Sequence, residues 1–167
     1  MSFGYQILGF GSGGAAGPPV VSATGDAETT VGDYTVHSYT GSGNFTVTGG
    51  SLTCDILCVA GGGGGSSGPY GGGAGAGGMR TSESALLGSY TITVGAGGAE
   101  QTSHGTPYAG NKGVDSSVGS TVVSTGGAKG NNFARAGYDG GSGSGGTGGG
   151  SAGGSGNEGG YSPVEGY

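Results

Sequence analysis

Glycine dominates the composition of this chain: 50 of its 167 residues are glycine, and only 31% are hydrophobic. Side-chain packing alone therefore cannot supply an ordinary core for a chain of this length. The formal net charge is −6 with only four Lys and Arg residues, which argues against a nucleic-acid partner, because phosphate binding needs clustered positive charge.

The N-terminal segment is apolar and then becomes rich in Gly, Ala and Pro. It lacks the charged region and the unbroken apolar run of a signal peptide, and no stretch reaches the ~18 apolar residues of a membrane span. We therefore expect no secretory signal peptide and no membrane insertion. Exposed apolar patches usually mark interaction sites, so residues 1–20 predict a docking peptide and leash; alternatively, the segment adds a strand to its own domain. The docking side chains are Phe3, Tyr5, Ile7, Leu8 and Phe10.

The next residues show strand patterns. Residues 33–48 read DYTVHSYT-GSGN-FTVT, two β-branched and aromatic runs around a glycine-containing loop, which predicts a hairpin. In residues 51–60, SLTCDILCVA, apolar residues alternate, which predicts a central strand. Further strands are expected within residues 84–98 and 116–127. No window has helical periodicity, so we predict an all-β domain, a small sandwich spanning residues 21–135.

Both cysteines fall in the predicted central strand. Four residues of strand would separate Cys54 and Cys58 by about 13 Å, too far for a disulfide. A metal site is not indicated either, because no histidine lies near. We expect both cysteines to act as small core residues.

Two long glycine tracts, residues 61–78 and 136–167, distinguish this chain from an ordinary β-protein. Structureless loops of this length are uncommon inside compact domains, and glycines recur in steps of three, as at Gly62, Gly65, Gly68 and Gly71. Three residues are the period of the polyproline-II helix. We therefore predict polyglycine-II-type helices packed as a bundle, in which neighbouring backbones bond to each other. The alternative is a flexible linker.

Glycine-rich sequence also matches catalytic motifs by chance. Ser66 and Ser151 satisfy G-x-S-x-G, but neither follows the strand–turn–helix pattern of a hydrolase. His37 and His104 have no carboxylate or cysteine cluster beside them, and no acidic pair suggests acid–base chemistry. We expect no enzymatic activity, no cofactor and no metal site.

Isolated aromatic residues stand out in the glycine-rich surroundings. Tyrosine can bury area against a ligand and keep a polar tip; alternatively, these side chains seal the bundle against the sandwich. The candidate receptor-contact residues are Pro69, Tyr70, Tyr108, Phe133, Tyr138 and Tyr161.

Several of these runs together carry a family resemblance. The run DYTVHSYTGSGNFTVTGGSLTCDILCVAGGGGG, followed by LLGSYTITVGAGG and SSVGSTVVSTGGAKG, resembles the glycine-rich domain of tailed-phage virion and tail-fibre proteins, over about residues 32–130. The opening MSFGYQILGFGSGG resembles the N-termini of small structural proteins of marine phages. The resemblance implies a virion component with polyglycine-II elements, which in fibre-tip adhesins display loops that contact host receptors.

We therefore expect a non-enzymatic protein of the phage virion surface, made in the host cytoplasm. It would dock to other phage structural proteins in several symmetric copies, and would serve host adhesion, through a receptor or glycan, or capsid decoration. The alternative function is an ice- or polysaccharide-binding protein, which would need regularly spaced threonines.

Overall fold

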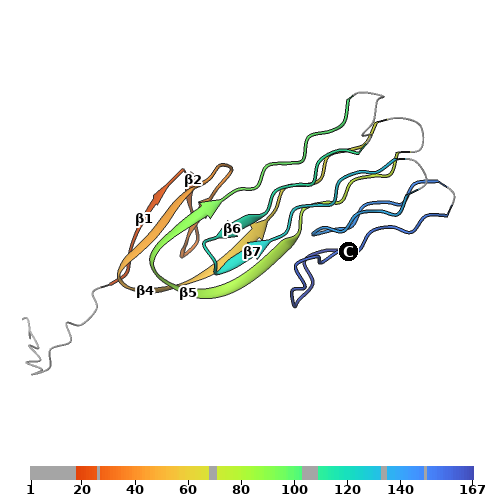
Figure 1. Cartoon of the computed structure of the whole chain (residues 1–167). Coiled ribbons are helices and arrows are strands. Elements are labelled where there is room, and N and C mark those ends of the chain that lie inside the picture. Colours follow the sequence, from red (N-terminus) through yellow and green to blue (C-terminus); the bar gives the residue numbers. More distant parts are fainter. Residues whose placement is uncertain (1–17, 26, 68–70, 103–108, 133–134, 149) are drawn as a thin grey trace, which may run out of the picture.

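The computed structural model describes residues 18–25, 27–67, 71–102, 109–132, 135–148 and 150–167. These residues form two antiparallel sheets (Figure 1), one with the strand order β1-β4-β5-β6-β7 and one made of β2 and β3. No helix in this part of the chain is long and apolar enough to cross a membrane. The strands are β1 (Val20–Thr24), β2 (Ala27–Val31), β3 (Tyr34–Ser38), β4 (Gly43–Val59), β5 (Met79–Thr93), β6 (Ser116–Val118) and β7 (Val122–Ser124).

A long antiparallel ribbon of β4 and β5 organises the larger sheet. Its pairing runs from Gly43 opposite Ile92 to Val59 opposite Met79, with a register shift between Val47 and Leu52. Figure 1 shows both strands curving strongly along their length. Gly88 lies in this irregular region with a φ of +100°, a conformation that residues with a side chain rarely adopt.

The apolar core is small and lies on one face of the ribbon. Its buried members are Phe45, Val47, Leu86 and Ile92. Alternate residues of β4 continue this face, including the half-buried Cys54, whereas Cys58 is buried further along. Both cysteines are free thiols, as the spacing on one strand predicted.

The predicted hairpin at residues 33–48 is wrong in its pairing. The strand β3 pairs with β2, and the residues expected to be its partner, Phe45 to Thr48, lie within β4 beside β1. The strands at 45–48 and 51–60 are one continuous strand. β1 takes the place beside β4 because its alternate residues Val21 and Ala23 pack against the core.

The all-β class is confirmed, but the small sandwich with a bundle of polyglycine-II helices is wrong. The second sheet has only two strands, and nearly all of their residues are exposed, so it forms no second core layer. The described residues contain no helix. Because the glycine tracts follow directly from the strands, they run on as extended chain that leaves and returns to the sheet (Figure 1).

Candidate functional site

The glycine tracts form an array of extended segments beyond the strands. We call the segments 60–67, 71–78, 94–102, 109–115, 125–132 and 135–158 the glycine array, leaving aside residue 149, which is not described. Figure 1 shows these segments side by side, although they are far apart in sequence. Side chains contribute little between them, so the backbone has to hold the array together.

Segment 125–132 lies at the centre of the array, and most of its residues are buried. The carbonyls of Thr125, Ala128 and Asn131 each accept an amide from segment 71–78, at 2.6–2.8 Å. The amides of Gly127 and Gly130 donate to segment 60–67 at 2.9 and 2.8 Å. Every third residue thus faces the same neighbour, and the buried backbone groups are satisfied by other segments.

This spacing leaves no room for side chains where segments meet. A Cβ added at Gly63 would lie 2.0 Å from the carbonyl oxygen of Ala128, and one added at Gly127 would lie 2.1 Å from that of Gly75. A Cβ at Gly65, on an open side of the same segment, would meet nothing within 4 Å. Glycine is therefore required on the faces that bond to neighbouring segments, but not at Gly65.

Polar side chains join the segments at the end of the array farthest from the strands. The Ser66 hydroxyl donates to the Asn131 carbonyl at 2.9 Å, and the Asn132 amide donates to the Ser67 carbonyl. Ser66 lies in extended chain and bonds to backbone, which is not the arrangement of a hydrolase nucleophile. The same end holds the described residues that flank residues 68–70 and 133–134.

Most predicted site residues lie outside the described part of the chain. The two that are described, Tyr138 and Tyr161, have different surroundings. The guanidinium carbon of Arg80, on β5, lies 3.8 Å from the ring centre of Tyr161, and Arg80 also donates to the Val123 carbonyl at 2.8 Å. Tyr161 thus packs against Arg80 beside the sheet, and its role as a receptor contact stays a prediction. Outside the described residues are Phe3, Tyr5, Ile7, Leu8, Phe10, Pro69, Tyr70, Tyr108 and Phe133.

Tyr138 instead lines a shallow depression of about 410 Å³ on the array. The ammonium of Lys129 lies 4.3 Å from its ring centre, within the range of a cation–π interaction. Lys112 forms an ion pair with Glu158 across segments, and Asp139 accepts the amide of Ser155 at 2.6 Å. We call this site the polar depression; its lining residues are Asn111, Lys112, Lys129, Tyr138, Asp139 and Glu158.

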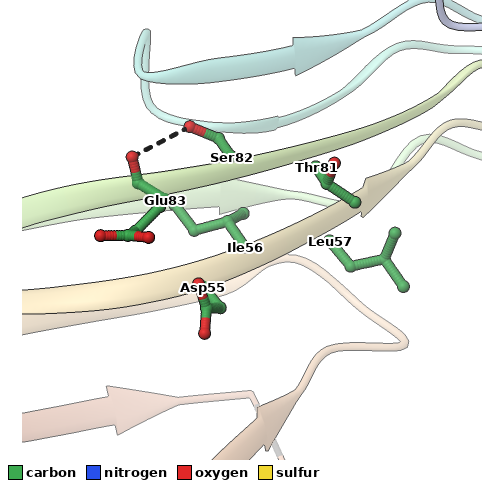
Figure 2. A pocket seen from close by; sticks show the side chains of 6 residues that line it. All are labelled: Asp55, Ile56, Leu57, Thr81, Ser82 and Glu83. Atoms are coloured by element: carbon green, nitrogen blue, oxygen red, sulfur yellow. Dashed lines mark hydrogen bonds between the residues drawn. The ribbon is translucent and has the colours of Figure 1, made fainter.

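A second surface lies on the exposed face of the β4–β5 ribbon (Figure 2). Asp55 stands directly opposite Glu83 in the register, and both are exposed. Leu57 points away from the ribbon beside them and is 65% exposed. Like charges opposite each other destabilise a sheet, so this face contributes little to the stability of the ribbon.

Burial alters the acidity of both thiols. Burial raises the pKa of Cys58, and burial together with the nearby charge of Asp55 raises the pKa of Cys54. Neither thiol is thereby activated as a nucleophile. Within the described ranges, no group of three or more His, Cys, Asp and Glu side chains is placed to hold a metal ion.

The C-terminal segment closes the junction between the sheet and the array. The Glu165 side chain is buried, and its Oε2 accepts the amide of Thr125 at 2.8 Å, while its backbone carbonyl accepts the amide of Met79 at 2.9 Å. This contact fixes the segment where β5 begins and β7 ends.

These features define an all-β protein whose glycine-rich half is held together by backbone hydrogen bonds. Residues 35–167 match the glycine-rich domain family, and the chain belongs to this family. No curated protein and no solved structure matches the chain.

Proposed function

We propose that this chain is a non-enzymatic surface protein of a phage virion. In this proposal, residues 1–20 dock it to other structural proteins of the particle, and the glycine array faces outward. The exposed end of the array serves host adhesion or capsid decoration, in several symmetric copies around the particle.

The observation that carries the proposal is the backbone bonding of the glycine array. Ordering glycine costs more conformational entropy than ordering any other residue. A flexible tether does not require an ordered backbone, whereas a display surface requires a fixed shape. Central segment 125–132 is bonded on several sides, which supports a rigid element over a flexible linker.

The arrangement of the array also supports display. The side-chain bonds from Ser66 to Asn131 and from Asn132 to Ser67 bring together the described residues next to two of the predicted contact regions, Pro69–Tyr70 and Phe133. The sequence resemblance to virion proteins provides the phage context, and membership of the glycine-rich domain family is compatible with it.

The alternative of an ice-binding protein has less support. Flat ice-binding arrays would need exposed, regularly spaced threonines, but Thr147, the only threonine within residues 140–160, is 4% exposed. Its hydroxyl accepts the amide of Arg135 at 2.9 Å. Thr147 therefore serves internal bonding.

The test is to compare particles that carry the full chain with particles that carry a chain lacking residues 1–10. We expect the full chain to be incorporated and to be labelled by antibody on intact particles. The shortened chain should keep its cooperative unfolding transition in solution but be absent from purified particles. Absence of the full chain from particles, or labelling only after the particles are opened, would contradict the proposal.

A further inference from the structure

We propose that the polar depression binds a saccharide that carries a carboxylate group. This inference rests on the proposed function, because it names the class of host molecule that the displayed array would contact. It concerns a site to which the sequence alone assigned only Tyr138.

The first argument is convergence. The lining residues come from four separate places in the sequence, each next to a glycine: Asn111–Lys112, Lys129, Tyr138–Asp139 and Glu158. The surrounding array is rich in glycine. Its folding therefore gathers an aromatic ring, an amide and charges of both signs at one depression, on segments whose backbones are fixed by hydrogen bonds.

The second argument concerns positive charge. The whole chain has only four Lys and Arg residues against ten Asp and Glu, yet Lys112 and Lys129 line the same depression. Lys112 is paired with Glu158. Lys129 has no acidic partner among the described residues, and its ammonium lies over the Tyr138 ring. An ammonium ion that is held in place but forms no ion pair is suited to bind a carboxylate from a ligand.

The third argument is the balance of donors and acceptors. Sugar hydroxyls donate and accept at the same time, and the depression offers carboxylate acceptors, an amide with both functions and ammonium donors. The Tyr138 ring adds apolar surface for the sugar face. A bound peptide strand would need free backbone groups, but the amides of Asn111 and Gly113 in segment 109–115 are already bonded within the array.

The experiment measures binding of the full chain to short oligosaccharides of galacturonic acid, glucuronic acid and sialic acid. Each is paired with its methyl ester, which has the same hydroxyls but no negative charge. Binding is followed by calorimetry and by NMR shifts of backbone amides near Lys129 and Tyr138. Inorganic phosphate and an oligoglutamate peptide serve as other anions.

We expect at least one acidic saccharide to bind and its methyl ester to bind about tenfold more weakly or worse, the scale of one charge-assisted hydrogen bond. Lys129→Met should weaken binding by a similar factor while keeping the aliphatic stem. The matched control is Arg135→Met, which removes an exposed cation that does not line the depression and should leave binding unchanged. Lys129→Gln, which removes the charge but keeps a polar end, provides a second variant if Lys129→Met fails to fold.

Four results would overturn the inference: no binding of any acidic saccharide, equal binding of acid and ester, equal loss in Arg135→Met, or equally strong binding of phosphate or oligoglutamate. The last result would indicate general anion binding. The proposed function and this inference are contradicted by different results. If the chain is present and labelled on particles but binds no saccharide, only this inference is lost; if it binds saccharide but is absent from particles, only the virion assignment is lost.

Discussion

The close approach of segments 60–67 and 125–132 gives a sharp test of the glycine array, through the substitution Gly63→Ala. The new Cβ would lie 2.0 Å from the Ala128 carbonyl oxygen, whereas ordinary contact begins at 3.4 Å. The two segments would have to separate by more than 1 Å. Such a shift breaks the two backbone hydrogen bonds that the amides of Gly127 and Gly130 donate to segment 60–67, which are 2.9 and 2.8 Å long.

Each broken buried bond costs about 2 kcal/mol, so the free energy of unfolding should fall by about 4 kcal/mol. The melting temperature should fall by roughly 8–16 °C for a chain of this size. The matched control is Gly65→Ala, where the methyl group meets nothing within 4 Å. It should be neutral or stabilise by roughly 0.4–1 kcal/mol, because alanine has less freedom in the unfolded chain.

Urea denaturation followed by circular dichroism measures both variants, with the midpoint and slope compared with the unchanged chain. Hydrogen exchange should show faster exchange of the Gly127 and Gly130 amides in Gly63→Ala alone. Equal stability of the two alanine variants would refute the reasoning, because it would mean that the segments are not held at the described distance.

Three further predictions concern the junction between the sheet and the array. Burial raises the pKa of Cys58, so its stabilising contribution is present below the unfolded thiol value of about 8.5 and is lost as the pH rises through the folded value. Unfolding of the Cys58→Ala variant should therefore depend less on pH above about 8.5. Arg80→Met removes the hydrogen bond to the Val123 carbonyl and the cation–π contact with Tyr161, and should lower the free energy of unfolding by about 2 kcal/mol. Glu165→Ala leaves the Thr125 amide without its acceptor, and should cost about 1–3 kcal/mol and accelerate exchange of that amide.

Each of these predictions has a contradicting result. An identical pH dependence with and without the thiol would show that burial at position 58 does not affect ionisation. Unchanged urea midpoints in Arg80→Met would show that Arg80 is not part of the packed junction. For Glu165→Ala, an unchanged exchange rate at Thr125 would mean that the C-terminal segment does not close the array.

The sequence predicted the main strand well but not its partners. Alternating apolar residues identified the inward face of β4, and the spacing of Cys54 and Cys58 correctly predicted free thiols. The strand pattern of residues 34–38 was also recognised, but not that it pairs with β2 instead of Phe45–Thr48. Local patterns give a strand its faces, whereas the partner depends on which distant segment buries the most apolar surface.

The candidate site could be predicted only in part. Tyr138 was recognised as an aromatic residue in glycine-rich surroundings, but Lys129, Lys112 and Glu158 carry no local signal that links them. Their meeting depends on the order in which segments 109–115, 125–132 and 135–158 lie beside each other. The one available hint was that each of these charged residues interrupts a glycine-rich stretch.

By itself, the sequence determined that the chain is all-β, that its two cysteines do not form a disulfide with each other and that long glycine-rich stretches allow close backbone approach. Tertiary structure alone decided that the glycine segments are extended chain and not helices, which of them are neighbours, and which glycines lack space for a methyl group. The physical reason is that backbone amides and carbonyls are identical in every segment and cannot select their own partners. The pairing is fixed by the strands from which the segments extend and by the few side chains that form bonds between segments.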